Sequence, residues 1–493
     1  MTHPQFTQTY SQFPEHFYSY VTPEILKDAQ LIHVNHHLLK DLNLSLNNDF
    51  NEDIIANMTA GIAFPDELRP LAQKYTGHQF GYYNPNLGDG RGVLLGQIQD
   101  SAEQSWDLHL KGSGLTPYSR SGDGRAVLRS SVREYLIGEA LHALKVPTTR
   151  CLSLSTGSEQ VYREQPEPRA SYIRLAKTHI RFGHFEWLAQ RGKATDLKNL
   201  ADYVITTVYP ELADIVPLQS RYAALLKTIT ENTAKMIAAW QTVGFCHGVM
   251  NTDNMSVAGE TFDFGPYAFL DDCKIHYICN HSDSEGRYAY SQQPNIGLWN
   301  CQVLALAFSQ LISSEDIDEA INTYVDTFNQ TYLNRMADKF GILSPEDDSK
   351  EFMAETLLLL DKSNLDFHYF FTQLEHFDSE NHSQFEAFIH QAATKHHSAW
   401  QTWQEDYRAI ISQQSNDERI QKLQSSNPKF VLRNYIAQEV ILATENGNFQ
   451  PLTQWMNWLQ NPFAEASTDT SPEQTYFSPP ASEKKSLVLS CSS

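Results

Sequence analysis

The sequence contains little cysteine, and its cysteines show no paired short spacings. The 493 residues include six Cys, at positions 151, 246, 273, 279, 301 and 491. Cysteines this far apart argue against a disulfide scaffold and favour a reducing compartment. No apolar run approaches the ~18 residues that cross a bilayer, and residues 1–20 lack the layout of a signal or transit peptide. We therefore expect a cytoplasmic protein with no membrane partner.

Positive charge is also scarce. The chain has 37 Lys and Arg against 59 Asp and Glu, which gives a formal net charge of −22. A broad surface for nucleic acid or anionic lipid needs the opposite balance, so we expect no nucleic-acid partner. The Gly-x-Ser-x-Gly and His-Glu-x-x-His motifs of common hydrolases are also missing.

The composition and the hydrophobic periodicity of the chain change along its length. Residues 1–75 form an irregular N-terminal extension, and residues 76–183 are glycine-rich and strand-like with one helix near residues 131–144. Residues 184–464 read as helical, and residues 465–493 form a polar tail without periodicity. This order predicts an α+β, two-lobed, protein-kinase-like fold. Its β-rich N-lobe carries one embedded helix, and its C-lobe is mainly helical.

Several elements have clear local signals. Residues 93–98 and 106–110 read as a hairpin, and strands are expected at 150–154, 160–162 and 170–175. An apolar stripe over residues 222–240 predicts a helix that stops at Gly244. A second hairpin is expected over residues 255–264.

The most informative motif begins at His247 and ends at Asn254, and Asp263-Phe-Gly follows nine residues later. It matches the His-x-Asp-x₄-Asn and Asp-Phe-Gly pattern of protein kinases, except that Val249 stands where the kinase has its catalytic Asp. Asn254 and Asp263 offer the oxygen ligands that Mg²⁺ or Mn²⁺ requires beside nucleotide phosphates. Valine cannot accept a proton, so Asp253 is the candidate base. Its alternative role is a solvated loop carboxylate.

Other residues suit phosphate binding. The segment Gly88-Asp-Gly-Arg-Gly92 precedes a strand, where backbone N–H groups can approach a phosphate, although a bare glycine turn is more often only a turn. A second glycine-rich loop spans residues 121–125 and is either a second phosphate clamp or a plain loop. Arg174 and Arg181 suit phosphate oxygens, and the alternative is that they are solvated surface residues.

Lys111 and Glu134 fit the strand–helix ion pair of a kinase-like lobe, in which the Glu orients the Lys ammonium onto phosphates. The alternatives are a strand-end surface lysine and a capping box formed by Ser131 and Glu134. A loose group of Cys and His between residues 273 and 281 lacks the spacing typical of zinc sites.

Taken together, these segments make the chain resemble the selenoprotein O family, kinase-like proteins that act as protein adenylyltransferases. The similarity extends over most of the chain, and the final Cys491-Ser-Ser stands where animal members carry selenocysteine. The resembling segments are Tyr75-Thr-Gly-His-Gln-Phe-Gly81, Asn86-Leu-Gly-Asp-Gly-Arg91, Leu110-Lys-Gly-Ser-Gly-Leu-Thr-Pro-Tyr-Ser-Arg120, Asp123-Gly-Arg125, Arg129-Ser-Ser-Val-Arg-Glu-Tyr135 and Met250-Asn-Thr-Asp-Asn-Met-Ser256.

The resemblance implies that ATP binds in a flipped orientation, with its γ-phosphate buried and its α-phosphate facing the acceptor. It implies transfer of AMP to Ser, Thr or Tyr hydroxyls of protein substrates, with release of pyrophosphate and with Mg²⁺ or Mn²⁺ as cofactor. Asp253 would be the proton acceptor, and Asn254 and Asp263 would bind the metal. The implied nucleotide-binding residues are Gly88, Gly90, Arg91, Lys111, Asp123, Gly124, Arg174, Arg181 and Asp263, with Glu134 supporting Lys111.

Two other functions remain open: a small-molecule kinase of the aminoglycoside-phosphotransferase type, which would yield ADP, and a non-catalytic nucleotide-binding pseudokinase scaffold. Val249 argues against the kinase, and the retained metal ligands argue against the scaffold. We expect a monomer. The selenocysteine position implies redox chemistry in the tail, so we also expect a disulfide between Cys491 and Cys279, with Cys273 as a second choice. The alternative is a free thiol at Cys491.

Overall fold

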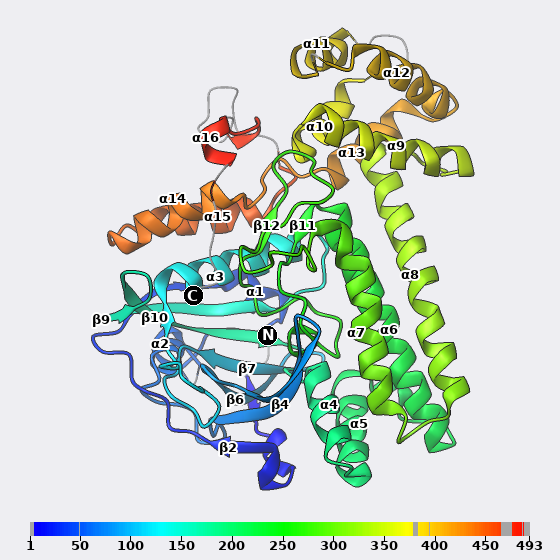
Figure 1. Cartoon of the computed structure of the whole chain (residues 1–493). Coiled ribbons are helices and arrows are strands. Elements are labelled where there is room, and N and C mark those ends of the chain that lie inside the picture. The colour runs from blue at the N-terminus through cyan, green and yellow to red at the C-terminus, as the bar shows by residue number, and fades with distance from the viewer. Residues whose placement is uncertain are drawn as a thin grey trace.

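A computed structural model of the protein describes residues 4–48, 50–377, 383–393, 395–464, 476–485 and 487. The N-terminal part is built on an antiparallel β-sheet, and the C-terminal half is largely helical (Figure 1). The predicted mixed α+β class is therefore confirmed at this level. Within the described residues, no helix combines the length and apolar character that a membrane crossing requires.

The strands of the main sheet follow the order β2-β4-β6-β7-β10-β9-β3, and neighbouring strands pair antiparallel. Three further strands pair with strands of this sheet but lie outside that order: β1 pairs with β6, β5 with β4 and β8 with β10. The N-terminal extension thus contributes strands to the sheet. The strands are β1 Gln5–Thr7, β2 Tyr18–Tyr20, β3 Gln30–Val34, β4 Leu71–Gln79, β5 Tyr82–Gly88, β6 Gly92–Gln99, β7 Ser105–Lys111, β8 Ala126–Val127, β9 Arg150–Tyr162 and β10 Pro166–Ala176.

The predicted hairpin of β6 and β7 is confirmed, with Ile98 opposite Trp106. Side chains alternate along β7 because successive residues of a strand point to opposite faces. Leu108 and Leu110 belong to an apolar core with residues of β6 and β10. The intervening residues place polar side chains on the other face of the sheet, which borders the candidate site.

Helix α3 spans Leu128–Ala143 and begins three residues before the predicted start at residue 131. Its N-cap is Val127, so Ser131 lies inside the helix and donates a hydrogen bond from Oγ to the carbonyl of Val127 at 2.9 Å. The capping-box reading of Ser131 and Glu134 is therefore wrong. Helix α3 packs between β9 and the helices α14 (Asn434–Glu445) and α15 (Gln450–Gln460) (Figure 1).

Helix α6 spans Leu218–Thr242, which confirms the helix predicted from the apolar stripe. Gly244 follows with φ +64°, a conformation that glycine adopts without strain. Helix α6 packs against α7 (Gln293–Phe308) and the long α8 (Ser314–Phe340), which runs beside it in Figure 1.

The hairpin predicted over residues 255–264 is wrong. Ser256 forms an isolated bridge with Arg181, and Thr261 forms one with Thr148. The only short sheet nearby pairs β11 (Phe245–Cys246) with β12 (Ala268–Phe269) within the described residues. Hydrogen bonds to distant segments thus replace the local pairing that the sequence suggests.

The remaining helices complete the molecule. Helices α9 to α13 form a group at the far end of α8 (Figure 1). Their bounds, with those of the other helices, are α1 His36–Asp41, α2 Glu52–Thr59, α4 Phe182–Gln190, α5 Ala194–Val208, α9 Asp347–Ser363, α10 Phe367–Gln373, α11 Ser383–Ala392, α12 His397–Ile411, α13 Asn416–Ser426 and α16 Ser482–Lys485.

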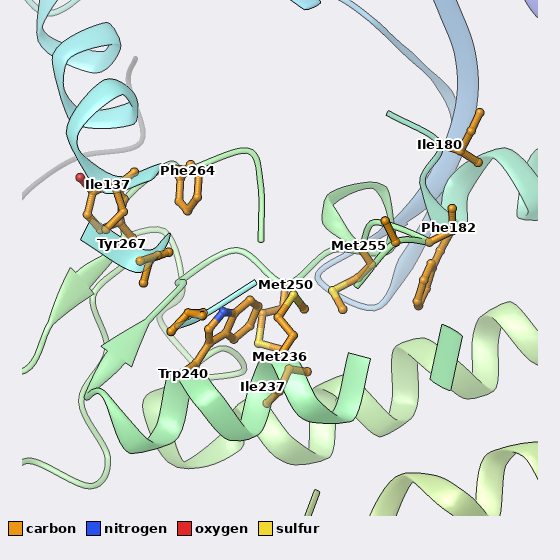
Figure 2. Close-up of a cluster of buried hydrophobic side chains, with 14 of the residues drawn as sticks. Ile137, Ile180, Phe182, Met236, Ile237, Trp240, Met250, Met255, Phe264 and Tyr267 are labelled. Carbon is orange, nitrogen blue, oxygen red and sulfur yellow. The ribbon is translucent and has the colours of Figure 1, made fainter. Parts of the chain in front are cut away.

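The loop that follows α6 is anchored by apolar side chains. Figure 2 shows Met250 beside Trp240 of α6, and Met255 beside Phe182 at the start of α4. All four side chains are buried. The two methionines bracket a 3₁₀ turn at Thr252–Asn254. The polar side chains of this turn are therefore held in place by a packed core.

Candidate active site

A cavity of about 960 Å³ lies where the two glycine-rich loops meet the loop of residues 247–254. The structure brings most of the predicted site residues to its wall. Glu134 and Arg174 lie behind that wall and do not line the cavity. The predicted residues that line it are Gly88, Gly90, Arg91, Lys111, Asp123, Gly124, Arg181, Asp253, Asn254 and Asp263.

The carboxylate of Asp263 lies among three cations. Its Oδ1 accepts hydrogen bonds from Lys111 Nζ and Arg174 Nη2, each at 2.8 Å, and its Oδ2 accepts one from Arg181. Burial opposes ionisation of Asp263, but the charges of Arg181, Lys111 and Arg174 hold its pKa well below the usual range. Asp263 is therefore a fixed anion at the wall of the cavity.

Glu134 connects the same cations from behind. Its Oε2 lies 3.2 Å from Lys111 Nζ, and its Oε1 accepts a hydrogen bond from Arg174 Nε at 2.7 Å. Lys111 is 6% exposed and Arg174 is 0% exposed. Neither is a solvated surface residue, so those alternative readings of the sequence are wrong. Arg174 reaches the cavity only through the two carboxylates that it binds.

The second glycine-rich loop is held by a residue that the sequence did not identify. The carboxylate of Asp123 accepts hydrogen bonds from Nη1 and Nη2 of Arg163, both at 2.9 Å, and from the backbone N–H of Arg125. The hydrogen bonds of Arg163 lower the pKa of Asp123. Arg163 lies between β9 and β10 and lines the cavity. No motif marks it, because its partner lies 40 residues away.

Asp253 lies in the 3₁₀ turn of the 247–254 loop and is 8% exposed. Gln79, from the end of β4, donates a hydrogen bond from Nε2 to Asp253 Oδ2 at 3.1 Å. Arg181 Nη1 donates to the backbone carbonyl of Asp253 at 2.8 Å. Burial raises the pKa of Asp253 to about 7. A carboxyl that titrates near neutrality suits a general base, and it is not the solvated carboxylate of the alternative reading.

Asn254 and Asp263, the predicted ligands of a divalent metal ion, both line the cavity. Asn254 Nδ2 donates to the carbonyl of Val249 at 3.1 Å, which leaves its Oδ1 as a possible ligand. No three His, Cys, Asp or Glu of the described chain gather closely enough to hold a metal alone. Two protein oxygens completed by phosphates and water are typical of Mg²⁺ at nucleotide sites.

The cysteines near the site are buried and unpaired. Cys279 Sγ lies 3.3 Å from Cys246 Sγ, and both are free thiols. Burial raises the pKa of Cys279 well above its usual value, so the thiol is poorly reactive in this position. Cys491 lies outside the described residues, and its disulfide with Cys279 stays a prediction.

Comparison with known proteins gives a consistent result. A family model described as protein adenylyltransferase SelO matches residues 1–460. The chain is 49% identical over 489 residues to a protein nucleotidyltransferase YdiU of Hydrogenovibrio crunogenus, covering 98% of each chain. Proteins of the same description from Aliivibrio salmonicida and Myxococcus xanthus are 42% and 41% identical, over 98% and 99% of each chain. The chain therefore belongs to the SelO family of protein adenylyltransferases, and it is an enzyme of the nucleotidyltransferase class.

Proposed function

We propose that the protein transfers AMP from ATP to Ser, Thr or Tyr hydroxyls of protein substrates and releases pyrophosphate. One observation carries the proposal. Val249 replaces the base of a kinase, while Asp253, a buried carboxyl, lines the same cavity as Lys111 and Arg181, two of the cations that bind Asp263. Compared with a kinase, the site thus retains a charged nucleotide pocket, and its proton acceptor is Asp253 instead of a residue at position 249.

The arrangement of charge supports a flipped nucleotide. Lys111 and Arg181 border the cavity beside Asp263, and Arg125 and Arg163 border it beside the second glycine-rich loop. An ordinary kinase site has no need of this second pair of arginines. An ATP molecule bound in the flipped orientation contacts both sides of the cavity. Its buried terminal phosphates lie at one side, and the rest of the molecule lies at the other.

The proposed reaction needs few groups. Asp253 accepts the proton of the acceptor hydroxyl, whose oxygen forms a bond to the α-phosphorus while the bond from that phosphorus to the β-phosphate oxygen breaks. Lys111 and Arg181 stabilise charge on the phosphates. Mg²⁺ or Mn²⁺, held by Asn254 and Asp263, would supply further charge neutralisation. Pyrophosphate leaves, and AMP remains on the protein.

The same observations support the finer form of the fold, a two-lobed kinase-like arrangement. In it, the sheet with α3 forms an N-lobe that supplies Lys111 and Glu134. The helices around α6 form a C-lobe that supplies Asp253, Asn254 and Asp263. The candidate site lies between them.

Product analysis tests the proposed function. The protein is incubated with ATP, Mg²⁺ or Mn²⁺ and a clarified cell extract as a source of acceptor proteins. We expect pyrophosphate to form together with protein-bound AMP detected by mass spectrometry. ADP with a phosphorylated small molecule would indicate the kinase instead. Tight ATP binding with neither product would indicate a non-catalytic scaffold.

A further inference from the structure

His109 occupies an unusual position at the candidate site. It lies on β7, two residues before Lys111, on the face of the sheet that borders the cavity. The residue is only 3% exposed. Neither ring nitrogen has a hydrogen-bond partner in the part of the chain that the structure describes. An unsatisfied polar group at a buried position is costly unless a ligand or water completes it.

A buried histidine of the 247–254 loop shows the contacts of a histidine that has only a structural role. His247 is 1% exposed, and both of its ring nitrogens have partners. Nε2 lies 3.1 Å from the carbonyl oxygen of Phe262, and Nδ1 accepts from the backbone N–H of Val249 at 3.3 Å. The ring of His109 instead has one stacking neighbour, His179, at a centroid distance of 4.6 Å. Its ring nitrogens make no hydrogen bond to the described part of the protein.

Asp89, between the glycines of the first loop, orients the ring. Its Oδ2 accepts the backbone N–H of Gln73 at 2.9 Å and lies 3.4 Å from His109 Nε2. Burial opposes ionisation of Asp89, but the charges of His109 and Arg181 lower its pKa, so it is an anion. The Nε2 side of the ring therefore faces a carboxylate, and Nδ1 is the nitrogen that has no nearby protein partner in the described chain.

Gly92 lies directly against the His109 ring, so the ring sits beside the glycine-rich loop. A Cβ built at Gly92 would collide with His109 Cε1 and would lie 3.0 Å from Nδ1. Gly92 follows Arg91 at the end of the glycine-rich loop, which is the loop expected to carry phosphates. The neighbouring groups at the cavity wall, Lys111 and Arg181, are cations. They favour an anionic ligand over a metal ion at this point.

We propose that His109, oriented by Asp89, binds a β- or γ-phosphate oxygen of ATP through a ring N–H. The proposal rests on the proposed function for the identity of the ligand. Placed between Asp89 and a phosphate, the ring donates a hydrogen bond from Nδ1 to the phosphate oxygen while Nε2 stays beside the Asp89 carboxylate. It thereby provides the phosphate end of the site with a donor that sequence motifs do not mark.

Isothermal titration calorimetry with ATP and with AMP, both in Mg²⁺, tests the proposal. His109→Phe keeps the ring volume and the stacking on His179 but has no N–H group. We expect it to raise the Kd for ATP about tenfold and to leave the Kd for AMP within twofold. His109→Asn, whose amide group keeps N–H donors, should recover most of the affinity for ATP.

His368 provides a matched control. It is also 3% exposed with two unpartnered ring nitrogens in the described chain, but it does not line the cavity. His368→Phe should leave both Kd values unchanged. An unchanged Kd for ATP in folded His109→Phe, or equal weakening of ATP and AMP, would overturn the proposal. If ATP affinity falls as expected while the wild-type protein transfers no AMP, this proposal stands and the proposed function fails. If the wild-type protein does not bind ATP, both fail.

Discussion

Two buried charge clusters in this molecule differ in a way that separates ligand binding from structural support. At the cavity, Lys111, Arg174 and Arg181 surround Asp263, with Glu134 behind. In the helical half, Arg433 alone holds Asp271 and Asp366, at 2.7 and 2.9 Å. Both clusters are well hydrogen-bonded and largely buried, with the side chains of Asp263 and Asp271 18% and 19% exposed.

The balance of charge and the surroundings set the two clusters apart. In the first, three cations contact Asp263, Glu134 and, through Arg181 at 3.7 Å, Asp89, and the cluster adjoins an open cavity. The second has one cation for two carboxylates, lies outside that cavity, and uses Asp366 to cap α10 through the N–H of Tyr369. Burial of charge alone is therefore a poor sign of function. Cations at the wall of an open cavity indicate an anionic ligand.

The largest expected effect comes from removing the central anion of the first cluster. Asp263→Ala should reduce AMP transfer by about 10³-fold or more, because the metal and three cations lose their common partner. It should also abolish the effect of Mg²⁺ on the affinity for ATP. Transfer assays and calorimetry with and without Mg²⁺ measure both changes.

Asp271→Ala is the matched variant in the second cluster. It should lower the melting temperature while the affinity of the folded protein for ATP stays at the wild-type value. If both variants impair ATP binding equally, the distinction between the clusters is wrong.

Arg174→Ala should cost about 4 kcal/mol of folding free energy, because it leaves Glu134 and Asp263 buried with one cation fewer. The sequence alone points to a ligand contact at Arg174. The burial of Arg174 between two carboxylates indicates a structural role as well. Urea unfolding of the nucleotide-free protein measures the loss, and a change below 1 kcal/mol would show that the first cluster does little for stability.

A buried carboxyl outside both clusters makes stability depend on pH. Glu260 is 6% exposed and accepts the N–H of Lys177, and burial raises its pKa from 4.5 to about 7. Between these values the folded state keeps a proton that the unfolded state has lost, so stability falls as pH rises from 4.5 to 7.

Glu260→Gln removes this dependence on pH. Relative to the wild type, it should gain about 3 kcal/mol between pH 4 and pH 8. Urea unfolding at the two pH values checks the sign. A larger relative gain at pH 4 would contradict it.

The smallest effect is expected at the partly exposed pair of Asp123 and Arg163. Asp123→Asn or Arg163→Gln should raise the KM for ATP only a few-fold and leave stability nearly unchanged, because an exposed pair contributes about 1 kcal/mol or less. The two substitutions together should cost no more than one of them. Additive effects in steady-state kinetics would show that the residues act separately.

Sequence patterns predicted the elements that depend on local signals. The β6–β7 hairpin and helix α6 follow from periodicity, and the residues around Lys111 and Asp263 follow from motif spacing. The sequence failed where distant contacts decide the structure. Ser256 and Thr261 pair with other segments instead of each other.

The missed site residues have the same cause. Gln79 contacts Asp253 across 174 positions of the chain, and no spacing rule connects them. His109 had a readable signal, since polar residues alternate with leucines along β7 as far as Lys111. Its neighbour Asp89 lies in a glycine-rich loop, where the recognisable motif consists of the glycines and not of the carboxylate between them.

Transfer of separately labelled phosphates tests the central claim most directly. The protein is incubated with ATP labelled on the α-phosphate or on the γ-phosphate, in parallel with Asp253→Ala. We expect α-label on protein with the wild type, no γ-label, and little of either with the variant, which should still bind ATP. Protein-bound γ-label without α-label, or full transfer of α-label by Asp253→Ala, would contradict this account.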